Sequence, residues 1–374
     1  MKKVSFTILA VLFLLLSATS LIQAKQLIVW KLSILATEYG HFIGTLCVAL
    51  AAATFMFARV PAAILILSAV LFFRPAVLAF AGDKRWANDL QKNLGAANPG
   101  PLLSAKQLWK FNQGTMIEPE RRVFSESPEK LVLDFYRTEC SDPVPWILVV
   151  HGGGWDSGDQ NQFRAFNSRL AHRGYSVVAM SYRLAPRWKW PAQKEDVLAA
   201  VKYVKENAAE LNVDPEQWAL VGRSAGGQIA QSIAYQTKPA GLKGIVAFYT
   251  PADLNFSYQF TVDNDIINSR QLLINLLGGK PGEVPQAYND ASPIEFAGKD
   301  STPSLLLHGG NDPLTWVLQS RRLMEKLAGG RAAYIELPWA THAFDFNLNG
   351  PGGQIAATAV DRFFDAILNK RGET

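Results

Sequence analysis

Two patterns of apolar residues divide the chain. The first 85 residues contain three long apolar runs, at 4–24, 41–58 and 60–82, and shorter runs alternate with polar stretches beyond them. An apolar run of about 20 residues is long enough to cross a bilayer as a helix. We therefore predict an N-terminal membrane region over residues 1–84, in which the first run is either a cleaved signal peptide or an uncleaved anchor.

The side of the membrane on which the rest of the chain lies follows from counting these runs. With Lys2 and Lys3 in the cytoplasm, three crossings place the main domain outside it. Cleavage after Ala24 leads to the same side. The basic residues that this topology places outside, against the positive-inside tendency, are Lys25, Lys31, Lys84 and Arg85. Arg74-Pro75 interrupts the third run, and the alternative for residues 41–82 is a buried helical hairpin in a soluble fold.

After residue 130 the pattern becomes one of strands alternating with helices. Short continuous apolar runs are typical of strands buried on both faces, and the segments between them repeat apolar residues three or four positions apart, as amphipathic helices do. This alternation predicts an α/β fold with a mainly parallel, twisted sheet flanked by helices. The expected strands are 130–136, 145–150, 177–180, 217–221, 244–249, 304–308 and 332–337.

The pattern also sets the expected domain organisation. Residues 85–129 are mixed and polar, and we interpret them as a linker that merges into the edge of the main domain, 130–374. Residues 250–300 break the rhythm with irregularly spaced apolar residues among Asn and Gly. An insertion after a strand of such a sheet is where substrate-selecting loops lie, so we expect a lid or pocket wall there. The alternative is a segment with a purely structural role.

Charge and cysteine content exclude some classes of partner and bond. The chain carries a net charge of +5, and residues 1–85 hold eight Lys/Arg against two Asp/Glu, so the main domain is nearly neutral. This balance gives no support to nucleic-acid binding, which needs a basic face on the folded domain. Cys47 and Cys140 are too few for a disulfide framework, and we expect no bridge between them.

A tight turn between the strand at 217–221 and the following helix carries the sequence Gly222-Arg-Ser-Ala-Gly-Gly227. Strand, G-x-S-x-G and helix in this order are the context of a nucleophile elbow, which projects the serine from the top of the sheet. Gly222 and Gly226 leave room where a Cβ would collide with the neighbouring element. Ser224 is therefore the candidate nucleophile, against the alternative of an ordinary strand-to-helix turn.

Three consecutive glycines follow another buried strand, in His151-Gly-Gly-Gly-Trp155. Such a run is costly unless the backbone must approach something closely. Main-chain N–H groups at this place can point at the charge that develops on a carbonyl oxygen, so the loop is a candidate oxyanion hole. The alternative is a flexible loop.

A serine hydroxyl needs a base, and the base needs a group that orients it. Of the five histidines, His342 lies in a loop after the last strand and is the best placed to reach across the top of the sheet. Asp312 follows the preceding strand and is the candidate orienting group. Asp345 is a competitor, but its closeness in sequence to His342 makes the approach to the imidazole awkward. The order Ser224, Asp312, His342 is that of α/β-hydrolases.

These motifs together resemble the α/β-hydrolase superfamily, specifically esterases of the hormone-sensitive-lipase-like group, over residues 130–370. The matching segments are His151–Trp155, Tyr182-Arg-Leu-Ala-Pro186, Gly222–Gly227, Asp312-Pro-Leu314 and His342-Ala-Phe344. The chain departs from the group at Arg223, where an acidic residue is common, and in its membrane region.

The resemblance implies a role for each residue in the motifs. Ser224 is expected to be the nucleophile, His342 the base and Asp312 the group that orients it. The N–H groups of Gly153, Gly154 and Ala225 are expected to form the oxyanion hole. Neither a metal nor an organic cofactor is implied.

The leading functional hypothesis is a membrane-anchored serine carboxylic-ester hydrolase, esterase- or lipase-like, that acts through an acyl-enzyme on a small-molecule or lipid ester. One alternative is an acyltransferase that uses the same three residues, and another is an amide or formamide hydrolase. A non-catalytic binding protein is disfavoured because the serine, histidine, aspartate and glycine loop are all intact. No obligate protein partner can be inferred from the sequence.

Overall fold

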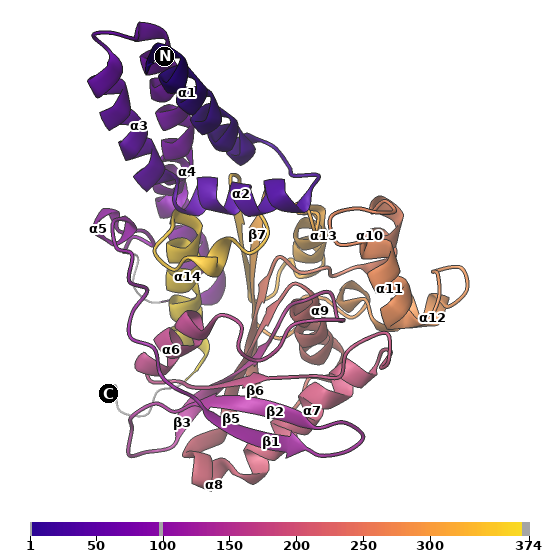
Figure 1. Ribbon diagram of the computed structural model, residues 1–374. Helices are drawn as coiled ribbons and strands as arrows, with labels where there is room; N and C mark the ends of the chain where they lie inside the picture. Colours follow the sequence, from indigo (N-terminus) through magenta and orange to yellow (C-terminus); the bar gives the residue numbers. More distant parts are fainter. Residues whose placement is uncertain (1, 97–99, 369–374) are drawn as a thin grey trace.

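An eight-stranded sheet forms the centre of the protein in the computed structural model, which describes residues 2–96 and 100–368 (Figure 1). The strand order is β1-β2-β4-β3-β5-β6-β7-β8. β2 pairs antiparallel with both β1 and β4, and all other neighbouring strands are parallel, which confirms the mainly parallel sheet. The strands are β1 Glu120–Ser125, β2 Leu131–Tyr136, β3 Val144–Val150, β4 Ser176–Met180, β5 Val213–Arg223, β6 Leu242–Phe248, β7 Ser304–Gly309 and β8 Ala332–Leu337.

Helices cover both faces of this sheet, which explains why its central strands are apolar throughout. In β3, Ile147 and Val149 face one buried cluster, and Trp146, Leu148 and Val150 face the other. The first cluster is completed by α6, α14 and the end of α4, and the second by α7, α9 and α13. These helices are α4 Arg59–Leu94, α6 Arg164–His172, α7 Ala192–Glu206, α9 Ala225–Ser232, α13 Leu318–Lys326 and α14 Pro351–Ile367, and the short α8 spans Ala208–Leu211.

The parallel strands bring the candidate residues to one edge. Val150 at the end of β3 pairs with Gly222, and Phe248 at the end of β6 pairs with both Arg223 and Leu307. The loops after β3, β5, β7 and β8 therefore leave the sheet side by side. The carboxyl edge of such a sheet is where ligands bind in open α/β folds.

Residues 250–300 form a helical insertion beside that edge. It consists of α10 Leu254–Phe260, α11 Ser269–Leu277, α12 Pro285–Asp290 and the 3₁₀ turn Pro293–Glu295. Asp253 caps α10 by accepting a hydrogen bond from the Phe256 N–H at 2.9 Å. In Figure 1 these helices stand together at one side of the sheet, next to the start of α2.

The N-terminal residues form a helical arm that projects from the domain (Figure 1). Its helices are α1 Lys2–Ala18, α2 Leu27–Glu38, α3 Gly40–Thr54 and the first part of α4. Among the described residues, Lys3–Leu21 and Arg59–Leu94 are long and apolar enough to cross a membrane, and α2 with α3, bent by 77°, could count as a third span. α2 lies across the base of the arm, between the apolar helices and the sheet domain.

The helix α4 passes without a break from the arm into the sheet domain. Trp86, Leu90 and Leu94 at its end are buried in the same apolar cluster as α14. The predicted boundary between residues 84 and 85 therefore falls inside a helix rather than at a linker. The predicted linker and edge, 85–129, also contains α5 Ala105–Leu108 and the edge strand β1.

Candidate active site

Ser224 lies in a sharp turn between β5 and α9. Its backbone has φ 52° and ψ −122°, a region that L-residues rarely occupy, and its N–H donates to the Phe248 carbonyl at 3.0 Å. A Cβ on Gly222 would lie 2.5 Å from the Gly226 carbonyl oxygen, and one on Gly226 would lie 2.2 Å from the His151 carbonyl oxygen. Only glycine fits at both positions, which is why the elbow sequence takes this form.

The glycine loop after β3 lies directly against the elbow. Gly153 and Gly154 have φ of 123° and 61°, so both need the freedom of glycine. Within the described part of the chain, the N–H groups of Gly153, Gly154 and Ala225 donate no hydrogen bond. The Ala225 N–H also lies in the first turn of α9, where helix geometry provides no internal partner. These donors are available to an anionic oxygen.

The Tyr182–Pro186 segment, which the sequence marked only as a motif, holds that loop in place. The Tyr182 hydroxyl donates to the His151 carbonyl at 3.1 Å, and its ring stacks on the His151 ring with centroids 4.1 Å apart. The Ala185 N–H donates to the Trp155 carbonyl at 2.9 Å. The Trp155 indole donates in turn to Gln228 of α9 at 2.9 Å. The glycine loop is thereby fixed at both ends.

Asp312 and His342 meet above the carboxyl ends of β7 and β8. His342 Nδ1 lies 2.7 Å from Asp312 Oδ2, and both side chains are buried. Asp312 Oδ1 accepts from the N–H groups of Leu314 and Thr315, each at 2.8 Å. Burial alone would raise the pKa of Asp312, but the attraction of His342 and the hydrogen bonds from His308 and His342 outweigh it. The net effect lowers that pKa well below its usual range, so the carboxyl stays ionised.

Asp345, the competing carboxylate, is engaged elsewhere. It accepts from Arg223 Nε at 2.7 Å and from the Tyr249 hydroxyl at 2.7 Å, and the Arg223–Asp345 pair is almost fully buried. The Arg223 guanidinium also lies 4.1 Å from the ring centroid of Phe163. The arginine that departs from the family pattern therefore has a partner of its own, which the sequence did not reveal.

Ser224 and His342 line the same cavity, without a hydrogen bond between their side chains in the described residues. Such contacts are often loose in unliganded enzymes and tighten when substrate binds. The Tyr249 ring packs on the His342 ring at 4.3 Å between centroids. The structure thus brings all six predicted site residues to one edge of the sheet.

Two cavities meet at Ser224. The one that we call the histidine-side cavity has a volume of about 520 Å³ and includes His342, Tyr249 and the glycine loop. The other, the lid-side cavity, has a volume of about 630 Å³ and is lined mainly by the 250–300 insertion. Both contain Ser224 and Gly154. The insertion therefore lines a cavity that contains Ser224.

Residues from the N-terminal arm also reach the site, and no sequence signal indicated them. The Gln23 amide donates to the Asp312 carbonyl, and the Trp30 indole donates to the His342 carbonyl at 3.1 Å. Trp30 lines the histidine-side cavity, and Gln23, Ala24 and Lys25 line the lid-side cavity. These contacts join residues about 300 positions apart, which no local pattern could connect.

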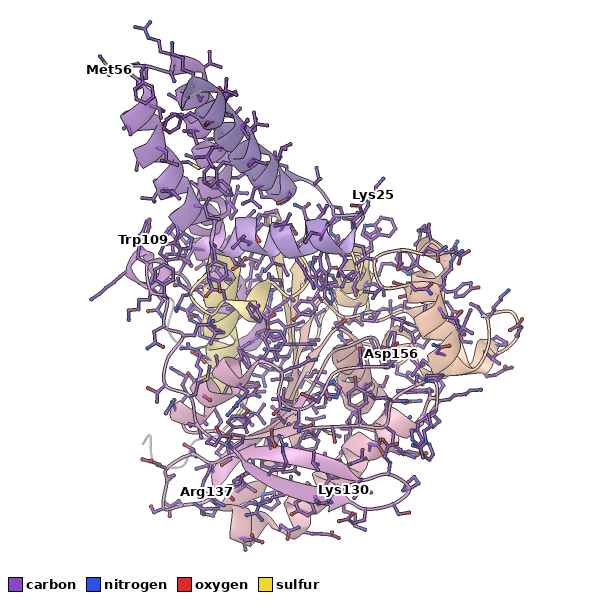
Figure 2. The ribbon with its side chains drawn as sticks, viewed as in Figure 1. Lys25, Met56, Trp109, Lys130, Arg137 and Asp156 are labelled. Atoms are coloured by element: carbon purple, nitrogen blue, oxygen red, sulfur yellow. The ribbon has the colours of Figure 1, made fainter. Side chains whose placement is uncertain are left out.

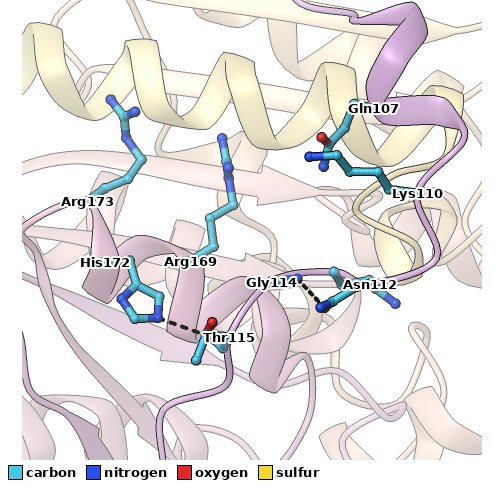
Figure 3. Close-up of a pocket in the computed structure, with 9 residues that line it drawn as sticks. Gln107, Lys110, Asn112, Gly114, Thr115, Arg169, His172 and Arg173 are labelled. Atoms are coloured by element: carbon cyan, nitrogen blue, oxygen red, sulfur yellow. Dashed lines mark hydrogen bonds between the residues drawn. The ribbon is translucent and has the colours of Figure 1, made fainter.

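A third cavity, of about 530 Å³, lies away from Ser224 between residues 107–115 and α6 (Figure 3). Arg169 and Arg173 line it, but both already form ion pairs with Asp361. Within the described residues there is no cluster of His, Cys, Asp and Glu that could hold a metal ion.

The sheet, the strained serine and the adjacent glycine loop define an α/β-hydrolase. The BD-FAE family matches residues 133–327, and the chain belongs to this family of hormone-sensitive-lipase-like α/β-hydrolases. Among curated relatives, the probable carboxylic ester hydrolase LipM and the esterase LipQ, both of Mycobacterium tuberculosis, are 31% and 30% identical over 63% and 64% of this chain. The matches span 58% and 60% of the lengths of these two relatives.

Solved structures agree with this fold. Esterase 2 of Thermogutta terrifontis, phosphonylated by sarin, is 25% identical with a TM-score of 0.52, over 62% of this chain and 87% of that one. The carboxylesterase EstE1, cloned from a metagenomic library, is 23% identical with a TM-score of 0.57, over 71% of this chain and 95% of that one. The second likeness concerns the fold alone.

Proposed function

We propose that this protein is a serine ester hydrolase that acts through an acyl-enzyme, with Ser224 as nucleophile, His342 as base and Asp312 as the group that orients it. The observation that carries the proposal is the buried contact of 2.7 Å between His342 and Asp312, beside the cavity that contains Ser224 in its strained turn. The names of the curated relatives, esterase and carboxylic ester hydrolase, support the same reaction class.

The chemistry follows from these positions. Ser224 Oγ attacks the ester carbonyl carbon while its proton passes to His342 Nε2, and ionised Asp312 stabilises the resulting imidazolium. The N–H groups of Gly153, Gly154 and Ala225 stabilise the oxyanion. His342 then gives its proton to the leaving alkoxide, and water, activated by the same histidine, releases the acid.

Active-site labelling tests the proposal. A fluorophosphonate probe is suitable because the Thermogutta esterase 2 is phosphonylated by sarin. We expect the probe to modify Ser224 and to block hydrolysis of p-nitrophenyl esters, and Ser224→Ala should lower kcat by about 10⁶-fold. Ser257→Ala, which removes another serine of the lid-side cavity, is the matched control and should still be labelled. Retention of more than roughly a tenth of the activity in Ser224→Ala would contradict the assignment.

The same labelled enzyme separates the alternatives that share its residues. Product analysis with added alcohols distinguishes hydrolysis, which yields the free acid, from acyl transfer, which yields a new ester. A parallel assay on a formamide substrate tests the amide-hydrolase alternative.

We also propose that the domain is anchored in a membrane and lies outside the cytoplasm. The supporting observation is that α1, α3 and the first part of α4 lie side by side in the arm, with the start of α1 and the turn from α3 to α4 at the end far from the sheet (Figure 1). Lys3 belongs to the start of α1, and Arg59 is the first residue of α4. Basic residues favour the cytoplasmic side. Protease added to spheroplasts should digest the sheet domain, whereas protection until lysis would place it in the cytoplasm.

A further inference from the structure

The two cavities at Ser224 have different roles in the proposed ester hydrolysis, on which this inference rests. His342 must protonate the leaving alcohol, so the alcohol group has to lie on the histidine's side of Ser224. His342 lines the histidine-side cavity and is not part of the lid-side cavity. The acyl chain of the substrate therefore extends from Ser224 into the lid-side cavity.

The lid-side cavity has the chemistry of an acyl-chain site. Its lining includes two charged residues, Lys25 and Asp265. Most of its large apolar side chains come from the insertion and from the loop after β7. They are Phe256, Phe260, Val262, Ile266, Ile267, Leu272, Leu273, Leu314 and Trp316. Each methylene that enters such a cavity leaves water, which favours long chains over short ones.

Part of the wall of this cavity belongs to the arm. Gln23, Ala24 and Lys25 connect the apolar helix α1 to α2, and they line the cavity together with the insertion. Figure 2 labels Lys25 where the start of α2 approaches the insertion, and Met56 at the far end of the arm. The candidate membrane span Lys3–Leu21 ends two residues before this wall. The cavity therefore lies next to the point where the chain passes from the apolar helix α1 to α2.

Large apolar side chains are exposed on the arm and on the insertion, close in sequence to residues that line this cavity. Ile22, Leu27 and Ile28 are exposed on the arm, and Phe260, Val262 and Trp316 are exposed on the insertion and the neighbouring loop. Contiguous exposed apolar groups mark a surface that contacts another apolar phase. Because Ile22, Leu27 and Ile28 follow closely on the candidate span Lys3–Leu21, we take that phase to be the surface of the bilayer in which we propose that the arm is anchored.

We propose that the substrate is a long-chain acyl ester of a membrane lipid, which enters the lid-side cavity from the bilayer between residues 22–28 and α10. Ala24 and the neighbouring residues of the arm then determine chain-length specificity. A water-soluble short-chain ester would use neither the depth of the cavity nor its apolar opening.

The lipid-substrate proposal can be tested with the full-length protein in proteoliposomes. Two substrates are compared: p-nitrophenyl butyrate in the buffer and a long-chain lipid ester in the vesicles. Ile28 is 60% exposed and lines neither cavity, and Met116 of the sheet domain is similarly exposed, at 54%. Ile28→Asp should lower kcat/KM for the vesicle lipid by roughly tenfold or more, because the side chain no longer partitions into the bilayer, and leave butyrate hydrolysis unchanged. Met116→Asp should change neither.

A second variant addresses the cavity itself. Ala24 is buried in the lid-side wall, and Ala24→Trp should narrow it, so that the ratio of long-chain to short-chain kcat/KM falls by roughly tenfold. Two results would overturn the lipid-substrate proposal but leave the proposed ester hydrolysis intact. One is that the unmodified protein hydrolyses butyrate but not the vesicle lipid. The other is that Ile28→Asp hydrolyses the vesicle lipid at an unchanged rate. Absence of hydrolysis of every ester would instead contradict the proposed function.

Discussion

Asp312 and Asp345 are both buried carboxylates near His342, and their partners assign them different tasks. Asp312 accepts from His342 and from two backbone N–H groups, and Asp345 accepts from Arg223 and Tyr249. In the mechanism that we propose, Asp312 therefore orients the imidazole, and we expect Asp345 to stabilise the elbow. Substitution by the isosteric amide separates the two tasks.

Asp312→Asn should lower kcat by about 10⁴-fold, because an amide favours the wrong tautomer of His342. Steady-state hydrolysis of a soluble p-nitrophenyl ester measures the effect. A loss of less than roughly tenfold would assign the orienting role to another group.

Asp345→Asn should act mainly on stability. It leaves the Arg223 guanidinium buried without a counter-charge, which costs about 3 kcal/mol or more of the unfolding free energy. We expect a clearly lower thermal midpoint, with kcat of the folded protein falling far less than in Asp312→Asn. If kcat rather than the midpoint collapses, Asp345 is the orienting residue after all.

For individual residues, local sequence motifs were enough to predict which residues meet at the edge of the sheet. Contacts between residues far apart in the sequence could not be predicted. The placement of Ser224, Asp312 and His342 at one edge of the sheet could be predicted because each follows a recognisable strand in a recognisable order. The partner of Arg223, and the hydrogen bonds of Gln23 and Trp30 to loops of the site, depend on tertiary packing across most of the chain.

Among the elements, the glycine loop and the insertion depend on each other. Gly154 has a φ of 61°, and a Cβ on it would lie 2.7 Å from Leu272 Cδ1 of α11. A residue with a side chain at position 154 would therefore both strain the glycine loop and displace α11.

Gly154→Ala should lower kcat by roughly 10² or more, because it misaligns one oxyanion donor, with backbone strain of about 1–3 kcal/mol. Gly282→Ala is the matched control, since no atom lies within 4 Å of its added Cβ. Steady-state kinetics on one soluble ester compares the two. Equal kcat values in both variants would exclude Gly154 from the oxyanion hole.

Whether a segment forms a strand or a helix could be predicted where the spacing of its apolar residues was regular. The residues at which helices and domains begin and end could not. The predicted strands match β2 to β8 because buried parallel strands are continuously apolar. The end of α4 was missed because polar residues after 82 suggested a linker, whereas Trp86, Leu90 and Leu94 continue its buried face at helical spacing.

For the whole molecule, His151 makes stability depend on pH. Burial lowers the pKa of His151 from 6.5 to about 4, and its Nε2 has no hydrogen-bond partner within the described residues. A buried base with a lowered pKa binds its proton more weakly in the folded state than in the unfolded state. The stability that it contributes is therefore complete above pH 6.5 and is lost progressively as the pH falls towards 4.

We expect the unfolding free energy to fall by about 3 kcal/mol between pH 6.5 and 4 through this group. His151→Gln should flatten the dependence of the thermal midpoint on pH over that window, and the exposed His172→Gln should leave it unchanged. If the thermal midpoint of His151→Gln still falls as steeply between pH 6.5 and 4, other groups cause the pH dependence and the prediction for His151 is wrong.

In the membrane-anchored arrangement that we propose, the unbroken helix α4 also determines how the protein meets its substrate. One continuous helix of about 54 Å, which contains Pro75, runs from the arm into the core. The sheet domain is therefore not joined to the arm by a flexible linker, and in that arrangement it keeps one face towards the bilayer. Enzyme and ester in the same membrane then meet by lateral diffusion in two dimensions. The rate should follow the mole fraction of ester in the surface, and dilution with inert lipid should slow it even when the total amount of ester is constant.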